Sequence, residues 1–133
     1  MNRRNASGTP PLALTVRQPW AAAILWGGKD TENRMWRTSH RGRLLIHAGT
    51  RADPWSDSPQ AAVIAAIPEE LRALRGVILG EVTLVDCIRG STSPWAAGRD
   101  NRWRWLLADP VPWDVPVPAT GQRRLWPFEG NLP

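Results

Sequence analysis

The sequence predicts a single α+β domain whose sheet is curled into a barrel-like shape, and three observations support this prediction. Five or six short runs of apolar and β-branched residues are separated by glycine, proline and polar residues, as is typical of short strands joined by turns. Apolar residues at helical spacing follow the first and the third of these runs. The length of 133 residues suits one domain with a modest core. This pattern is typical of an α+β domain with a curled sheet or pseudobarrel.

The first elements follow directly from local signals. Residues 1–11 are polar and basic and end in two prolines, so we predict a disordered basic N-terminal arm. Residues 12–16 (LALTV) predict a short strand. A helix then begins at Pro19, because proline suits the first helical position, and it ends before the glycine pair that starts at Gly27.

Charge is concentrated in residues 28–42 (GKDTENRMWRTSHRG), between this helix and the next strand. If the segment after the turn is extended, Glu32, Arg34 and Trp36 share one face, because side chains alternate along a strand. Lys29 lies in the turn just before them. Opposite charges then meet at one rim of the fold. The residues alone leave open a second interpretation, a solvated strand whose surface salt bridges contribute little.

The second half of the chain contains the remaining elements. We predict strands at residues 44–48, 76–88, 103–108 and 122–128, helices at residues 59–67 and 69–75, and loops at residues 49–58 and 89–102. Residues 76–88 are apolar on both faces, as in a strand covered on two sides. Residues 109–119 are rich in proline and can contribute only edge or extended structure.

Two acidic residues interrupt the apolar strand at residues 76–88. Period two puts Glu81 and Asp86 on opposite faces. One of them could line a cavity or a barrel mouth, and a paired structural carboxylate is the alternative.

Cysteine and histidine usage limits the possible chemistry. Cys87 is the only cysteine, so no intramolecular disulfide can form, and we expect the thiol to pack in the core of an intracellular, cytoplasmic protein. The two histidines, His40 and His47, do not form a zinc-ligand spacing with it. We therefore predict no metal and no cofactor. No run approaches the roughly 18 apolar residues of a membrane span, so we expect no membrane association.

The charge balance is basic. The 17 lysine and arginine residues outnumber 12 acidic ones, and the formal net charge is +5. Lys29 is the only lysine, so the positive charge consists of planar guanidinium groups that suit phosphates and base edges. This balance favours a polyanionic partner such as nucleic acid, although it also fits an ordinary soluble basic protein.

Several segments together resemble the ASCH domain family. The matching residues are LTVRQPW at 14–20, the motif G-x-K-x-x-E-x-R formed by Gly27, Lys29, Glu32 and Arg34, then Trp36, HRGRL at 40–44, Ile46, Leu79, Gly80, Val82, Leu84, Asp86, Cys87, Gly121 and Trp126. The resemblance covers about residues 12–128 and leaves residues 129–133 as a C-terminal tail. It implies a PUA-like β-barrel with two or three flanking helices. In related folds, a cleft edged by this motif holds RNA or a modified base.

The resemblance implies a nucleic-acid interface, and the residue types at the matching positions suit contacts with phosphates and bases. Lysine and arginine can contact phosphate or guanine, and glutamate can accept a hydrogen bond from an amino edge of a base. Trp36 or Trp95 could stack on an unpaired base, an interaction worth about 1 to 3 kcal/mol. The candidate binding residues are Arg17, Gln18, Lys29, Glu32, Arg34, Trp36, His40, Arg41, Arg43 and His47. We expect RNA or a single-stranded or flipped base as the ligand, ahead of regular duplex.

Two alternatives remain open. Some bacterial ASCH-like proteins are similar in motif but hydrolyse N4-acetylcytidine, with a lysine in the motif, a threonine three residues later and a glutamate after the late strand. Lys29 matches that lysine, and Lys29 and Glu32 would be the catalytic pair here. However, Glu32 occupies the threonine position, and residues 89–102 contain Asp100 but no glutamate. A ribonuclease has also been proposed in the family. The other alternative is a protein-interaction module.

Overall fold

The computed structural model describes residues 8–98 and 101–133. Most of the predicted N-terminal arm, residues 1–7, and Asp100 lie outside the described residues. The strands are β1 (Leu12–Gln18), β2 (Thr31–Arg34), β3 (Gly42–Ala52), β4 (Val77–Arg89), β5 (Trp103–Pro118) and β6 (Leu125–Pro127). The helices are α1 (Trp20–Trp26), α2 (Ala61–Ala65) and α3 (Glu69–Arg72).

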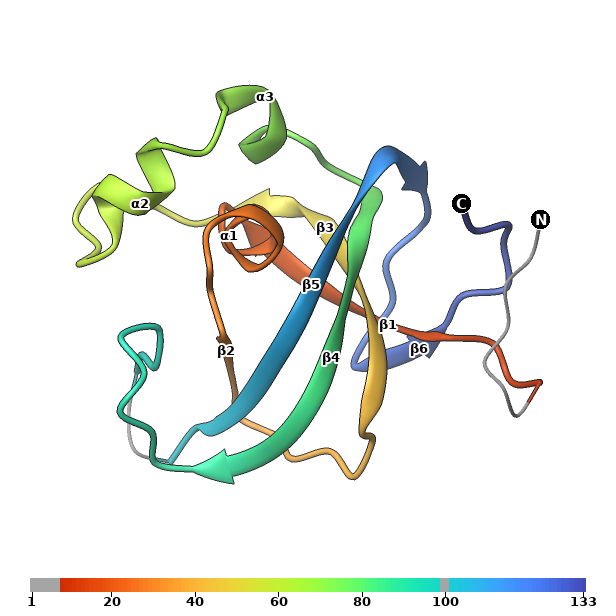
Figure 1. The fold of residues 1–133 in the computed structure, drawn as a ribbon, viewed down its shortest axis with the longest axis horizontal. Coiled ribbons are helices and arrows are strands. Elements are labelled where there is room, and N and C mark those ends of the chain that lie inside the picture. The colour runs from red at the N-terminus through yellow and green to blue at the C-terminus, as the bar shows by residue number, and fades with distance from the viewer. Residues whose placement is uncertain (1–7, 99–100) are drawn as a thin grey trace.

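The six strands form one sheet in the order β2-β5-β4-β3-β1-β6. β1 and β3 are parallel, and the other neighbouring strands are antiparallel. The predicted α+β class is confirmed. The sheet is curled in the manner of a PUA-like barrel, but β2 and β6 are its two edges, so it is not a closed barrel (Figure 1).

The helices lie at one end of the curled sheet. α1 packs against β1, β3, β4 and β5, and α2 and α3 lie farther out on the same side (Figure 1). α1 is apolar over most of its surface, and all residues from Ala21 to Leu25 are buried. Ile64 and Ile67 pack on the outer face of α1. Among the described residues, no helix is long and apolar enough to cross a membrane.

β5 is much longer than the strand predicted at residues 103–108. β4 pairs with it as far as Pro118, whereas β2 pairs only with the part from Trp103 to Leu106. The second half of β5 therefore has one open edge, where a proline without an N–H group is tolerated. The prediction that residues 109–119 form edge structure is confirmed. β3 also continues to Ala52, so the loop that follows it begins later than predicted.

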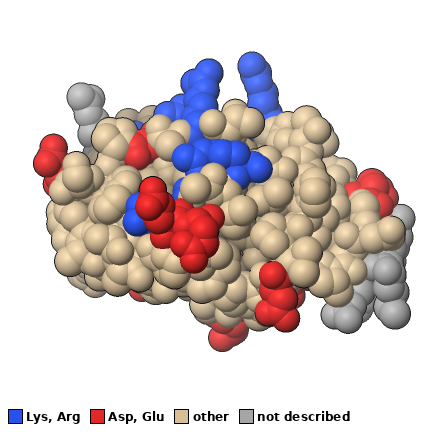
Figure 2. Space-filling view, turned by 90° about the horizontal axis from the view of Figure 1, so that it is seen from above, with Lys and Arg blue, Asp and Glu red and all other residues tan. Residues whose placement is uncertain are grey.

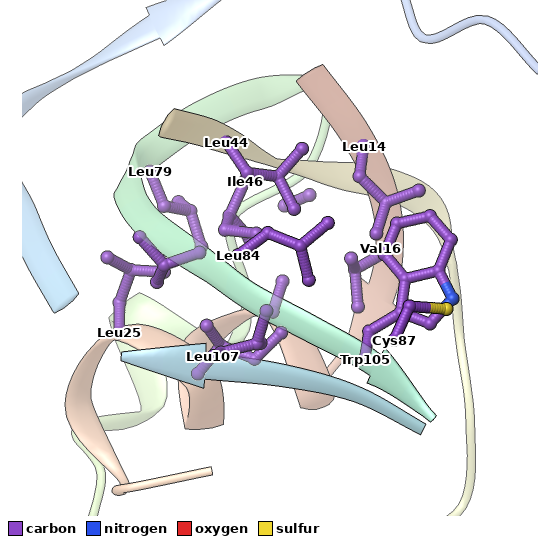
Figure 3. Close-up of a cluster of buried hydrophobic side chains, with 14 residues drawn as sticks. Leu14, Val16, Leu25, Leu44, Ile46, Leu79, Leu84, Cys87, Trp105 and Leu107 are labelled. Atoms are coloured by element: carbon purple, nitrogen blue, oxygen red, sulfur yellow. The ribbon is translucent and has the colours of Figure 1, made fainter. Parts of the chain in front are cut away.

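The main core lies between the sheet and α1. Figure 3 shows Leu14, Val16, Leu44, Ile46 and Leu84 converging on one another. Cys87 and Trp105 complete the same cluster, and Cys87 is 6% exposed. The expected core position of the cysteine is therefore confirmed. Trp20 is only half-buried and packs against this cluster. It also packs against a second cluster, called here the α1–α2 cluster, which consists of Ala22, Ala23, Ile64, Ile67 and Trp95.

A second contact region fixes β6 against β1. The Trp126 indole N–H donates to the Thr15 hydroxyl at 3.2 Å, and that hydroxyl lies 3.1 Å from His47 Nδ1. His47 Nε2 lies 2.8 Å from the Ala119 carbonyl oxygen, which fits a neutral ring that donates to Ala119 and accepts from Thr15. Burial lowers the pKa of His47, and the hydrogen bond to Ala119 opposes part of this effect.

We predict that Gly80→Ala destabilises the fold by about 1 to 3 kcal/mol, as overpacking does. A Cβ atom at Gly80 would meet the Leu25 Cδ1 atom at 2.7 Å and the Pro112 Cα atom at 2.8 Å, and it would come still closer to the Val111 carbonyl oxygen. Two of these three atoms are backbone and cannot move without opening the β4–β5 contact. Urea unfolding measures the change, and an unaltered midpoint would contradict the prediction.

We also predict that His47 makes the fold less stable in mild acid. The unfolded chain keeps the ordinary pKa of 6.5, and the folded value is lower. Below about pH 6.5 the unfolded state therefore binds more protons, and stability is lost as the pH falls toward the folded pKa. Melting temperatures between pH 7.5 and 5 should fall more steeply for the natural protein than for His47→Gln. Parallel pH profiles would assign the acid sensitivity to other groups.

Candidate functional site

A cleft of about 1260 Å³ opens beside β2. One wall consists of the end of β1, Trp20, Lys29 and residues 32–36. The other walls come from residues 94–98 with Arg102, and from the end of β3 and the segment that follows it, where most of residues 49–60 take part. Segments that are far apart in the sequence thus meet at the side of the sheet where β2 lies.

The floor of the cleft contains a buried ion network. Lys29 Nζ donates to Glu32 Oε1 at 3.1 Å and also to the Thr31 carbonyl oxygen. Arg34 Nε donates to Glu32 Oε2 at 2.9 Å, and another Arg34 nitrogen donates to the Thr15 carbonyl oxygen at 2.8 Å. The Lys29 side chain is 4% exposed and that of Glu32 10%. The predicted meeting of opposite charges therefore occurs inside the fold.

Local structure explains this placement. Gly28, at φ +75, turns the chain after α1 in a conformation that favours glycine. The Lys29 backbone N–H then donates to the Ala23 carbonyl oxygen at 3.0 Å, which anchors the start of the motif to the helix. From Thr31 the chain is extended, so Glu32 and Arg34 share one face as predicted.

The network keeps Glu32 ionised. Burial alone raises the pKa of its carboxyl group, but the charges of Lys29 and Arg34 and their hydrogen bonds outweigh burial. The pKa of Glu32 is therefore held below its ordinary value of 4.5. Chemically, Glu32 is a hydrogen-bond acceptor at neutral pH and is not suited to donate a proton.

Three tryptophans line the cleft, namely Trp20, Trp36 and Trp95. Trp36 meets the Trp105 ring edge-on, with 4.7 Å between ring centroids. Trp95 is 8% exposed and packs into the α1–α2 cluster. The Trp20 indole N–H donates to Asp53 Oδ2 at 2.9 Å. The rings are therefore fixed by packing and hydrogen bonds.

Basic and acidic side chains both line the cleft. Arg17 donates to Asp53 Oδ1 at 3.1 Å, and its side chain is 54% exposed. Arg51, Asp57 and Arg102 also line the cleft. Figure 2 shows the molecule from above, relative to the view in Figure 1, and on this face acidic and basic side chains again lie close together. The positive net charge is therefore not gathered into one uniform patch on that face.

The structure places five of the predicted binding residues away from this cleft: Gln18, His40, Arg41, Arg43 and His47. The Gln18 side chain donates to the Leu71 and Leu74 carbonyl oxygens at 3.0 and 3.2 Å. It thereby joins β1 to the end of α3. His47 belongs to the β1–β6 contact described above, and His40 contacts the Arg43 carbonyl oxygen at 2.8 Å.

The two remaining arginines of this group pair with the acidic residues of β4. Arg41 Nη2 lies 3.1 Å from Asp86 Oδ1, and Arg43 Nη2 lies 2.7 Å from Glu81 Oε2. Of the two interpretations offered for these carboxylates, the structure supports the paired one, because both form ion pairs and neither lines the cleft. Arg17, Lys29, Glu32, Arg34 and Trp36 are the predicted residues that the cleft brings together.

The sequence-based selection missed the wall formed by residues 49–60. Its Arg51, Asp53 and Asp57 stand in a segment that looks like an ordinary polar loop, and no local signal distinguishes them. Met35, which is 57% exposed in the cleft, was also missed. Within the described part of the chain, no group of three or more His, Cys, Asp or Glu side chains could hold a metal ion.

Comparison with known proteins gives a consistent result. A family model described as "ASCH domain" matches residues 14–102. The chain is 29% identical over 136 residues to human "Activating signal cointegrator 1" and 28% identical over 132 residues to the mouse protein of that name, and each match covers 90% of this chain. The chain spans only 22% of the length of these two relatives. Since the family match covers more than half of its residues, this chain belongs to the ASCH domain family, a family associated with RNA binding.

Proposed function

We propose that this chain binds single-stranded RNA and holds one unpaired or flipped base in the cleft beside the Lys29–Glu32–Arg34 network. One observation carries the proposal: an ionised carboxylate, aromatic rings and exposed arginines line the same cleft of about 1260 Å³. A base offers amino groups and a flat ring, and its phosphates are anionic. The cleft supplies a complementary group for each of these features.

Glu32 is the group best suited to read a base edge. Each of its oxygens already accepts a hydrogen bond, Oε1 from Lys29 and Oε2 from Arg34. An ionised carboxylate has about four lone-pair sites, so further sites remain for a ligand. Cytosine N4 and the guanine amino group are donors that a carboxylate accepts. The proposal therefore favours bases with an exocyclic amino group.

The fixed tryptophans support stacking. Ring orientation is set by the Trp36–Trp105 contact and by the hydrogen bond from Trp20 to Asp53. A ring that is already immobile loses little conformational entropy when a base stacks on it. Stacking depends weakly on base identity, so Glu32 would supply the selectivity and the rings the affinity.

Arg17, Arg51 and Arg102 at the opening would contact the sugar–phosphate backbone. Such contacts position a ligand without reading its sequence. They also make affinity fall with added salt, because bound cations are released from the RNA.

Hydrolysis is less well supported by the same geometry. In an amidohydrolase at least one of Lys29 and Glu32 must transfer a proton or attack the acyl carbon. Here the Lys29 ammonium group is engaged by Glu32 and by the Thr31 carbonyl oxygen. The lowered pKa of Glu32 suits a proton acceptor but not a proton donor.

We predict that Met35→Glu weakens binding of a 12-nucleotide single-stranded RNA by about tenfold at low salt. The side chain is 57% exposed in the cleft, so the fold should tolerate the change while the new carboxylate repels phosphate. Val115→Glu is the matched control, because Val115 is 70% exposed on β5 and does not line the cleft. Fluorescence anisotropy measures both. Equal weakening by the two variants would argue against binding in the cleft.

Single-stranded RNA should also bind more tightly than a blunt duplex of the same sequence, because an unpaired base is available without the cost of unpairing. Two hairpins that differ only by one unpaired cytidine provide a second comparison, in which the hairpin with the unpaired cytidine should bind more tightly. Equal affinity for the duplex and the single strand would contradict the proposed recognition of an unpaired base.

We predict that the natural protein releases no acetate from N4-acetylcytidine and does not cleave RNA above the background rate. The reason is that the lysine and the glutamate of the motif hold each other in an ion pair. Chromatographic assays of both substrates provide the measurement, with Lys29→Met as the comparison. Turnover by the natural protein that Lys29→Met removes, with melting temperature preserved, would replace the binding proposal by a hydrolase.

A further inference from the structure

Three exposed arginines lie over tryptophan rings near the end of the sheet where β2, β4 and β5 meet. The guanidinium carbons of Arg37 and Arg89 lie 5.6 and 4.6 Å from the centroid of the Trp103 ring. That of Arg124 lies 4.7 Å from the centroid of the Trp36 ring. We name Arg37, Arg89, Arg124 and the two rings beneath them the arginine–tryptophan surface.

This surface adjoins the cleft. Trp36 lines the cleft and directly precedes Arg37, and Arg102 lines it and directly precedes Trp103. In the sheet, Trp103 pairs with Arg34 of β2 on one side and with Arg89 of β4 on the other. An RNA strand that leaves the cleft past Arg34 would therefore next meet Arg37 and Arg89.

The supporting residues are fixed in place. The Trp105 indole N–H donates to the Trp36 carbonyl oxygen at 3.3 Å, and an Arg41 nitrogen donates to the Thr38 carbonyl oxygen at 2.8 Å. These bonds hold the segment on both sides of Arg37. Arg89 is the last residue of β4. Side chains on such fixed supports lose less entropy when they bind a ligand.

The guanidinium groups of this surface keep donors available. Arg17, Arg34, Arg41 and Arg43 each pair with a carboxylate. By contrast, Arg37, Arg89 and Arg124 form no ion pair with a carboxylate among residues 8–98 and 101–133, and all three are exposed. A guanidinium group that stacks with its flat face still presents its N–H groups at the edge. That edge matches the fork of two phosphate oxygens.

We propose that the arginine–tryptophan surface binds the phosphate groups of the RNA strand that continues from the base held in the cleft. The inference rests on the proposed function and adds a second contact region to it. A guanidinium edge matches the paired oxygens of a phosphate and of a carboxylate alike. RNA is favoured over an acidic peptide because the surface adjoins a cleft that is lined by groups complementary to a base.

The test compares two double variants of the full chain, Arg37→Gln with Arg89→Gln and Arg72→Gln with Arg75→Gln. The second is a matched control, because Arg72 also stacks on a tryptophan, 5.0 Å from the Trp55 centroid, but lies on α3. Both remove two positive charges. Binding of oligo-cytidine of 4 and 12 nucleotides, whose bases carry the exocyclic amino group that Glu32 can accept from, is measured by anisotropy from low to moderate salt, with melting curves as a check on folding. Arg124→Gln tests the third arginine separately.

We expect Arg37→Gln with Arg89→Gln to weaken binding of the longer RNA by about tenfold and to flatten the dependence of log affinity on log salt by about 0.7 per lost phosphate contact. Binding of the short RNA should change much less. The control pair should retain the natural affinity and slope.

The outcomes separate this inference from the proposed function. If Met35→Glu weakens binding but Arg37→Gln with Arg89→Gln matches the control pair, the inference is wrong and the cleft proposal stands. If the arginine variant weakens binding and Met35→Glu does not, the cleft proposal is wrong and this surface is the RNA site. Tighter binding of poly-glutamate than of RNA, lost in the arginine variant, would overturn the inference in favour of an acidic protein partner.

Discussion

The partly buried hydrogen bond from Arg34 to the Thr15 carbonyl oxygen is the contact on which the rest of the site depends. β2 pairs only with the start of β5, and in the order of the sheet it is an edge strand, separated from β1 by β5, β4 and β3. Arg34 joins the two strands directly and is itself neutralised by Glu32. Removing one partner of a buried ion pair typically costs about 3 to 5 kcal/mol, because the other charge stays buried. The network therefore holds β2 in place as a wall of the cleft.

Thr15 connects this wall to the other edge of the sheet. Its carbonyl oxygen accepts from Arg34, and its hydroxyl group contacts both Trp126 and His47. β6 is only three residues long, so strand pairing alone would hold it weakly. The side chains of the β1–β6 contact supply the remaining attachment. Thr15 of β1 thus contributes to the cleft and to the attachment of β6, and changes in one region are expected to affect the other.

Local periodicity was sufficient to place some site residues but not others. Alternation along a strand puts Glu32 and Arg34 on one face wherever that strand lies in the fold, and the turn before it brings Lys29 close. Arg43 is different, since its pairing with Glu81 depends on the register between β3 and β4, which no local pattern encodes. The wall at residues 49–60 reaches the cleft because β3 continues to Ala52 and Ile64 packs against α1. Such long-range packing is invisible in the sequence of a polar loop.

The difference between local pattern and long-range packing also explains why net charge is a weak guide to a binding surface. A formal charge of +5 does not tell which arginines are neutralised by carboxylates and which present their donors to solvent. The nine tryptophans matter here, because a guanidinium group can lie flat on an indole ring and still donate from its edge, which a lysine ammonium group cannot do. Trp36, Arg37 and Arg89 lie within residues 14–102, the part that matches the family, whereas Trp103 and Arg124 lie outside it. The arginine–tryptophan surface therefore combines residues from the matched part of the chain with residues that follow it.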